Sequence, residues 1–236
     1  MVPTPSYPLR VLMYHKISAD GQTDMLTVPV RDLEWQLHHL LQEGYRTISL
    51  SELVNHLRQG TPLPEKPLLI TFDDGYLDNF TNAYPVFRQL GMKANIFLVP
   101  SFIDTDTYLG VNDLKAMDPS LIEFGLHSFD HVNYRDLSKD AVLADLDKCK
   151  KSLTEKGIAF QPCLAFPFGA WPKKGPASQA FFEALAERKL SAAFRIGNRL
   201  NRLPLKEPWL IERLDIRGGI TQKKFTRLVR KGKSLF

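Results

Sequence analysis

The chain has 236 residues, of which 44% are hydrophobic and 24% are charged. These values suit one soluble α/β domain of barrel size, and the chain is short for two domains. No segment approaches the roughly 20 consecutive apolar residues of a transmembrane helix, and residues 1–10 lack the apolar core of a secretory signal. We therefore expect a single domain over residues 1–236 in the cytoplasm, the alternative being a signal removed before the first residue. The two cysteines stand in no CxxC pattern, which favours reduced thiols.

The net charge of +5 is unevenly distributed along the chain. Residues 172–236 contain 16 Lys or Arg and 5 Asp or Glu, a balance of +11, so the rest of the chain carries −6. Such asymmetry indicates an anionic partner of the C-terminal part, namely phosphate, an anionic membrane surface or nucleic acid, with a solvated basic face as the alternative. Nucleic acid is the weakest of these partners, because no zinc-finger, RNA-binding or recognition-helix pattern accompanies the charge.

Short apolar segments alternate with amphipathic ones along the chain. Apolar runs predict strands, and apolar residues at helical spacing predict helices, several of which end at a glycine. The expected strands are 10–14, 45–50, 68–74, 94–99, 122–126, 163–166, 192–195 and 211–216. The expected helices are 30–43, 52–58 capped by Ser51, 79–90 with a kink or boundary at Pro85, 112–117, 138–156, 177–189 and 221–231. Residues 20–28 are expected to form a loop.

This alternation predicts a parallel sheet covered by helices, with a core over about residues 10–216 and a basic helix over about 221–232. Right-handed crossovers allow such a sheet to close into a barrel or to remain open and doubly wound. The pattern does not separate these two architectures, because closure depends on the register of the strands.

The segment from Leu68 to Gly75 carries the strongest functional signal. An apolar strand runs directly into Asp73 and Asp74, and the carboxyl ends of parallel strands are where α/β folds place their chemistry. Neighbouring residues of a strand point to opposite sides, so we expect the two carboxylates to have different tasks, one binding and one facing the reaction. An ordinary Asp-Gly turn is the alternative.

His127 and His131 follow the predicted strand 122–126 and are four residues apart. If the turn between them is helical, both imidazoles project from one face, within reach of a single metal ion. An aspartate from another strand would complete three protein ligands with an open position, which is typical of a catalytic metal site. The other aspartate could then act as a base on metal-bound water. A surface histidine pair is the alternative.

A third segment, Phe166-Pro167-Phe168-Gly169, follows a later strand at the same rim. Its proline and glycine impose a fixed turn, and the exposed backbone N–H groups of such a turn could form an oxyanion hole. Taken alone, the same residues would form an ordinary loop.

In their order and spacing, these three segments resemble the first three motifs of the NodB-like polysaccharide deacetylases, which are carbohydrate esterase family four. The segment 13–17 also resembles the start of family members that act on poly-N-acetylglucosamine and related cell-surface glycans, and the resemblance extends from Val11 to about Ile216. It implies a distorted (β/α) barrel of about seven parallel strands. It further implies a hydrolase that removes an N-acyl group, in first place acetyl, from an amino sugar with the help of a divalent metal. Zinc is the first choice of metal, with cobalt, nickel or manganese as alternatives.

The resemblance also implies roles for individual residues. Asp73 matches the catalytic base, and the backbone N–H of Phe168 would hold the oxyanion together with the metal. The implied metal ligands are Asp74, His127 and His131. The implied substrate-binding candidates are Pro167, Gly169 and Tyr14.

The chain departs from the family pattern at the third motif and at the last one. Phe168 stands where the family usually has tyrosine, and the arginine that often precedes this motif is absent. No histidine follows His131, although the family's last motif supplies one as general acid. His15, after the first strand, is the candidate proton donor, with a structural hydrogen bond as the alternative. Arg213 and Asp215 on the last strand are candidates for orienting the catalytic base.

The expected partner is an N-acylated amino sugar or glycan, and the sequence does not indicate an oligomeric state. Two alternative functions are a catalytically impaired relative that binds glycan and a deacylase of a small or lipid-linked N-acyl compound. The basic helix has Phe225, Leu228 and Val229 on one side with cations around them, which suits contact with an anionic membrane or a phosphate-linked substrate. Packing of these three residues on the core is the alternative.

Overall fold

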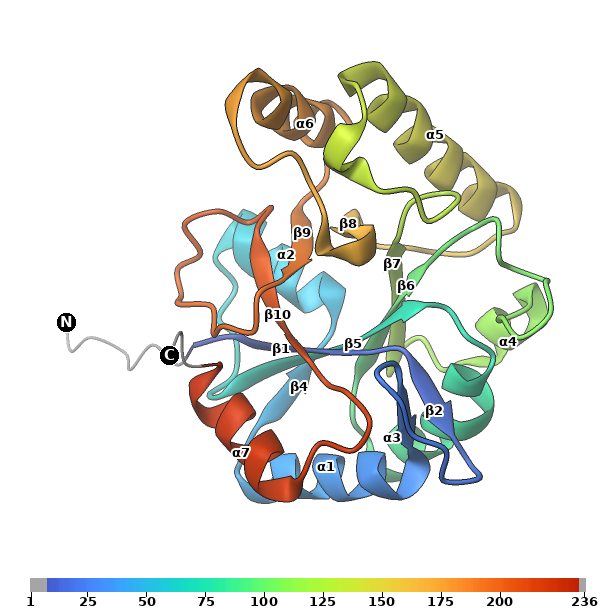
Figure 1. The fold of residues 1–236 in the computed structure, drawn as a ribbon, viewed down its shortest axis with the longest axis vertical. Coiled ribbons are helices and arrows are strands. Elements are labelled where there is room, and N and C mark those ends of the chain that lie inside the picture. Colours follow the sequence, from blue (N-terminus) through green and yellow to red (C-terminus); the bar gives the residue numbers. More distant parts are fainter. Residues whose placement is uncertain (1–7, 234–236) are drawn as a thin grey trace.

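The structure is a computed structural model that describes residues 8–233. Seven parallel strands form a closed barrel, and helices surround it (Figure 1). The first and second barrel strands of the sequence pair with each other, from Arg10 opposite Leu68 to Tyr14 opposite Phe72, and this pairing closes the ring. The architecture is therefore the barrel and not the open sheet. The strands in spatial order are β1 (Arg10–Tyr14), β10 (Ile211–Asp215), β9 (Ala192–Ile196), β8 (Cys163–Ala165), β7 (Ile122–Leu126), β6 (Ala94–Leu98) and β5 (Pro67–Asp74).

Strand β5 has eight residues and three partner strands. Along one edge it pairs with β1. Along the other edge, β4 (Arg46–Ile48) pairs with the start of β5, and β6 pairs with its end, from Thr71 to Asp74. β4 is therefore an additional strand outside the ring, and the second half of β5 carries its two aspartates to the rim of the barrel.

The helices cover the outside of the barrel (Figure 1). They are α1 (Val30–Gln42), α2 (Leu50–Gln59), α3 (Tyr84–Leu90), α4 (Val111–Ala116), α5 (Lys139–Glu155), α6 (Gly175–Glu187) and α7 (Gln222–Lys231). Short helical turns lie at Asn79–Ala83, Tyr134–Asp136 and Pro167–Gly169. The two short strands β2 (Lys16–Ser18) and β3 (Thr27–Pro29) pair with each other.

Two local predictions are wrong in detail. α2 begins after Ser49, which forms a capping box with the glutamate three residues on. Ser51 instead donates its hydroxyl to Glu123 and so ties α2 to β7. The boundary expected at Pro85 is confirmed, because this proline lies in the first turn of α3, where its missing N–H costs little. The expected loop 20–28 is shortened, because its last residues belong to β3.

Side chains of the barrel strands alternate between the interior and the space beneath the helices. On β1, Val11 belongs to the interior cluster, whereas Leu12 and Tyr14 belong to the outer one. Tyr14 is fully buried there, stacks on Phe72, and donates its hydroxyl to Gln36 at 2.7 Å. The predicted contact of Tyr14 with a substrate is therefore wrong, because the alternation of the strand turns this side chain away from the barrel interior.

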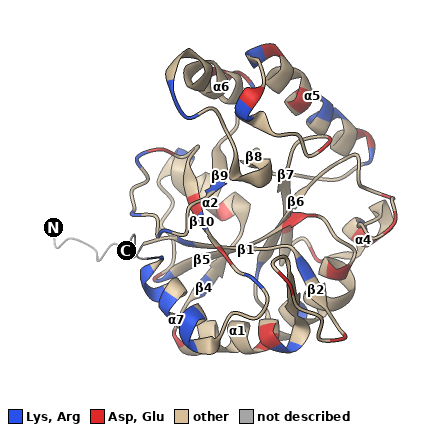
Figure 2. Ribbon diagram, viewed as in Figure 1, with Lys and Arg blue, Asp and Glu red and all other residues tan. Residues whose placement is uncertain are grey.

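The basic helix α7 packs on the core through its apolar side. Phe225 and Val229 are 0% and 2% exposed, and the ring of Phe225 meets that of Trp35 of α1 edge-on. The structure thus shows the core packing that was the alternative to lipid contact for these side chains. In the described part of the chain, no helix is long and apolar enough to cross a membrane. The outer side of α7 is strongly basic (Figure 2), and its exposed cations include Lys223, Lys224 and Arg227.

Candidate active site

Asp74, His127 and His131 meet at the carboxyl end of the barrel. The Oδ1 atom of Asp74 lies 3.3 Å from Nε2 of His127 and 3.2 Å from Nε2 of His131, and one ligand atom from each residue lies within 4.8 Å of the others. This Oδ1 atom is buried and has no hydrogen-bond donor among the described residues. A buried carboxylate oxygen that faces two ring nitrogens fits a divalent cation, for which nitrogen and oxygen donors of this kind are suitable ligands.

The backbone at the end of β5 brings both aspartates to the same cavity. Asp73 follows the interior alternation of the strand, but Asp74 has φ of 72° and Gly75 has φ of 78°. These left-handed residues end the strand and turn the Asp74 carboxylate back over the rim. The expectation that the two side chains point to opposite sides is therefore wrong here, because strand alternation stops one residue earlier. Their different tasks arise from different partners.

The two histidines are brought together by a loop, since residues 127–133 contain no helix. Ser128 and His131 have positive φ angles of 62° and 55°, and the two imidazole rings lie 4.9 Å apart at 63°. Nδ1 of His127 hydrogen-bonds the carbonyl of Ala165 at 2.9 Å. This bond directs the other ring nitrogen, Nε2, toward Asp74, as is usual for a metal-ligating histidine.

Asp73 is held by Arg213 of β10. Nη1 and Nη2 of Arg213 donate to Oδ1 and Oδ2 of Asp73 at 2.5 and 2.7 Å, and both side chains are almost fully buried. Burial opposes the charged form of Asp73, but Arg213 and His127 more than offset it and lower the pKa of this carboxyl. Oδ2 lies 3.7 Å from Nε2 of His127. Asp73 is thus an ionised carboxylate fixed beside the three candidate ligands.

A cavity of about 230 Å³ opens above these residues. Its lining includes His15, Gly169 and Asp215, which the sequence had singled out. Asp215 accepts from Arg217 at 2.6 Å, whereas Arg213 is the residue that holds Asp73, so the suggestion that Asp215 orients the base is wrong. Four lining residues lie outside every motif found in the sequence, namely Met25, Leu26, Ile196 and Arg217.

His15 lies in the cavity wall after β1. Its burial lowers the pKa of the imidazole, while the nearby carboxylates of Asp73 and Asp74 oppose this effect. Its backbone carbonyl accepts from the side chain of Asn79 at 2.7 Å, which fixes the residue beside the rim. The imidazole of His15 thus faces the same cavity as the two carboxylates.

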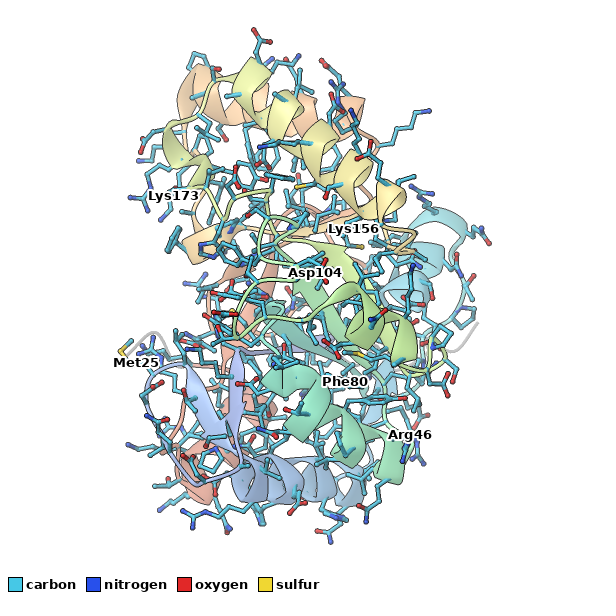
Figure 3. The ribbon with its side chains drawn as sticks, turned by 90° about the vertical axis from the view of Figure 1, so that its right-hand side faces the viewer. Met25, Arg46, Phe80, Asp104, Lys156 and Lys173 are labelled. Carbon is cyan, nitrogen blue, oxygen red and sulfur yellow. The ribbon has the colours of Figure 1, made fainter. Side chains whose placement is uncertain are left out.

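The turn after β8 supplies the opposite wall. Phe168 has φ of 59°, its side chain is 65% exposed, and its ring lies 4.6 Å from that of His131. Gly169 is necessary here because a Cβ atom would come within 3.0 Å of the backbone nitrogen of Ile196. Pro167 is buried and does not line the cavity, so its predicted substrate contact is wrong, and it shapes the turn instead. Across the cavity Met25 is 63% exposed and projects from the loop between β2 and β3 (Figure 3).

Residues 60–184 match the family model for polysaccharide deacetylase. The chain is 32% identical over 163 residues, 69% of its length, to the protein YxkH of Bacillus subtilis (strain 168), which carries the same family name. The matched region is 57% of that relative, so the chain spans little more than half of its length. The chain is also 31% identical over 105 residues, 44% of its length, to the poly-beta-1,6-N-acetyl-D-glucosamine N-deacetylase of Escherichia coli (strain K12), of which the match covers 16%.

Solved structures share the fold over nearly the whole chain. The Streptococcus pyogenes deacetylase PplD has a TM-score of 0.81 at 18% identity, with 95% of this chain and 99% of that chain covered. A de-N-acetylase from Aggregatibacter actinomycetemcomitans has a TM-score of 0.80 at 18% identity, with 94% and 100% covered. The closed barrel with its helices is therefore the fold expected from the sequence resemblance.

Proposed function

The chain belongs to the polysaccharide deacetylase family, and we propose that it hydrolyses the N-acetyl group of an amino sugar in a polysaccharide or glycoconjugate. One observation carries this proposal: a buried aspartate held by Arg213 stands beside a second aspartate and two histidines with the spacing of metal ligands. Relatives named as N-deacetylases of poly-beta-1,6-N-acetyl-D-glucosamine support an N-acetylated glucosamine polymer as the first substrate to test.

Asp74, His127 and His131 would hold a divalent ion, for which we propose zinc. When bound, such an ion lowers the pKa of a water and polarises a carbonyl oxygen. Two observations support this assignment. The Oδ1 atom of Asp74 is buried without a hydrogen-bond partner among the described residues, and the bond of His127 to Ala165 directs Nε2 of His127 toward Asp74. The site of three protein ligands leaves room for water and substrate, as catalytic sites require.

Asp73 is proposed as the general base. Because Arg213 holds its pKa below the usual range, Asp73 is ionised at neutral pH and can take a proton from the attacking water. Arg213 also fixes the direction of the carboxylate through two hydrogen bonds. The backbone N–H of Phe168 is proposed to donate to the oxyanion that forms on the amide carbonyl.

His15 is proposed as the proton donor to the leaving amine. The family's usual histidine after the second motif is missing from this chain, and His15 is the histidine of the cavity that is not a candidate ligand. It follows β1, which pairs with the strand that carries Asp73. A base and an acid that line the same cavity suit hydrolysis of an amide bound there.

Acetate release from chitooligosaccharides tests the proposed function. Protein stripped by a chelator is expected to release no acetate, and added zinc or cobalt is expected to restore release. Binding of the oligosaccharide without release, in the metal-loaded protein, would support the glycan-binding alternative instead. Release only from small or lipid-linked N-acyl compounds would change the substrate class and keep the chemistry.

For the partner of α7 we propose a phosphate-linked substrate or an anionic membrane surface that bears it. Lys223, Lys224 and Arg227 are exposed, and none of them has an ion-pair partner in residues 8–233. Because Phe225 and Val229 are buried, this contact would be electrostatic and would weaken with salt.

A further inference from the structure

Asp145 of α5 lies next to the loop that carries His127 and His131. Its Oδ1 atom accepts from the hydroxyl of Ser128 at 2.9 Å and from the backbone N–H of Phe129 at 3.0 Å. Its Oδ2 atom accepts from the hydroxyl of Tyr134 at 2.5 Å. One carboxylate thus binds the loop at three points, on both sides of His131.

We propose that Asp145 is a positioning residue that holds His131 in the geometry needed to bind the metal. This proposal rests on the metal site proposed above and extends it to a residue of a helix outside the barrel. Asp145 does not touch the candidate ligands, and its effect would be transmitted through the loop.

The conformation of the loop explains why it needs such support. Ser128 and His131 both have left-handed φ angles, a conformation that costs L-residues free energy and persists only where surrounding contacts enforce it. Residues 127–133 contain neither helix nor strand, and backbone bonds to the carbonyl of Leu98 and from the N–H of Ser101 hold only His127 and Phe129. The bonds to Asp145 add side-chain support to this loop.

The direction of the hydrogen bonds links Asp145 to His131 specifically. A serine hydroxyl has one proton to donate, and that of Ser128 goes to Asp145. Its oxygen therefore accepts from the backbone N–H of Val132 at 3.0 Å. This second bond closes the loop over His131. Among residues 8–233, the ring of His131 has no backbone hydrogen bond of the kind that His127 makes with Ala165.

Asp145→Ala is the direct test, with metal affinity as the readout. Zinc affinity of the stripped protein is measured by competition with a chromophoric chelator, which requires no substrate and so does not depend on the proposed reaction. Loss of a group that orients a metal ligand typically weakens metal affinity about 10- to 100-fold, and we expect a loss in this range. An affinity within twofold of that of the unchanged protein would overturn the proposal.

Asp147→Ala is the matched control, because Asp147 lies on the same helix and carries the same charge. It is exposed and pairs with Arg188 on the outside of the molecule. We expect unchanged zinc affinity. An equal loss in both variants would show a general effect of charge or of helix stability, and the proposal would fail.

Two milder variants separate positioning from stability. Asp145→Asn keeps an oxygen that can accept from Ser128 and Phe129, so we expect a smaller loss of affinity than in Asp145→Ala. Ser128→Ala removes the hydrogen bonds of the Ser128 hydroxyl with Asp145 and Val132, and it replaces Asp145→Ala if that variant does not fold. Unchanged zinc affinity in Ser128→Ala would contradict the proposal. In each variant the rise in Tm on adding zinc is expected to shrink, whereas a purely structural role would lower Tm equally with and without zinc.

Discussion

Arg213 of β10 donates hydrogen bonds to both carboxylate oxygens of Asp73. The last barrel strand of the sequence thus fixes the carboxylate that is proposed as the base. The arginine is fully buried, and a guanidinium matches a carboxylate in a way that a lysine cannot. The arginine that the family often places before its third motif is absent from this chain. In this chain, Arg213 of β10 supplies the positive charge beside Asp73 and fixes the direction of its carboxylate.

Substitution of Arg213 is expected to shift the pH dependence of the reaction. Arg213→Met leaves the Asp73 carboxyl buried without its main counter-charge, so the pKa of Asp73 rises. When the pH is lowered, the variant is therefore expected to lose activity at a higher pH than the unchanged protein does. Arg213→Lys restores the charge without the paired hydrogen bonds, and we expect it to recover the acidic limb but only part of kcat. A pH profile of kcat/KM decides this, and an unshifted limb in Arg213→Met would contradict the assignment.

Asp73→Asn is expected to abolish acetate release while zinc binding is kept. The substitution removes the base and preserves the shape of the side chain, and loss of a general base typically costs about 10²- to 10⁴-fold in rate. Zinc titration of the same variant provides the control. Retained activity would refute the mechanism.

Replacement of His15 by Gln should lower kcat and make the rate sensitive to the leaving amine. If His15 donates the proton, substrates whose amine leaves easily, such as N-acetyl anilines with electron-withdrawing groups, should lose less rate than amino sugars. A structural hydrogen bond would instead reduce Tm and affect all substrates alike. His38, exposed on α1, provides a control through His38→Gln.

Phe168→Ala is expected to raise KM with little change in stability. Phe168 is 65% exposed, and its ring contacts that of His131 at the cavity. In this position the ring can pack against the face of a sugar. Loss of an aromatic contact worth about 0.5–1.5 kcal/mol corresponds to a factor of roughly 2 to 10. Phe168→Tyr should retain the KM of the unchanged protein. If kcat fell with KM unchanged, the ring would have another role.

Cosedimentation with anionic liposomes at low salt tests the partner of α7. We expect binding that is lost in Lys223→Glu/Lys224→Glu and in high salt, because exposed charges are screened over about 10 Å at 0.1 M salt. Liposomes of neutral lipid serve as the control. If the unchanged protein stays in the supernatant with anionic lipid, the membrane surface is excluded, and phosphate-linked sugars remain to be tested by the same charge reversal.

The sequence predicted the strands and the residues at their ends, because apolar runs and the Asp, His and Pro-Phe-Gly segments are local signals. The run Ile122–Leu126 is a strand with the bounds that were expected. The alternation of strands and helices did not decide between a closed barrel and an open sheet, and it left Arg213 and Asp215 as equal candidates for orienting the base, since both questions depend on which distant strands become neighbours. The left-handed turn at Asp74 and the loop at His131 were missed for a related reason: side-chain contacts from elsewhere, such as those of Asp145, stabilise conformations that the local sequence disfavours.

The ring is closed by β1, which lies between β5 and β10. The proposed proton donor follows β1, and the arginine that holds the base lies on β10, near opposite ends of the chain. The region matched by the family model, residues 60–184, contains every proposed metal ligand and the base but neither of these two residues. The proposed activity therefore depends on contact between segments that are far apart in the sequence, whereas the proposed metal ligands all come from residues 74–131.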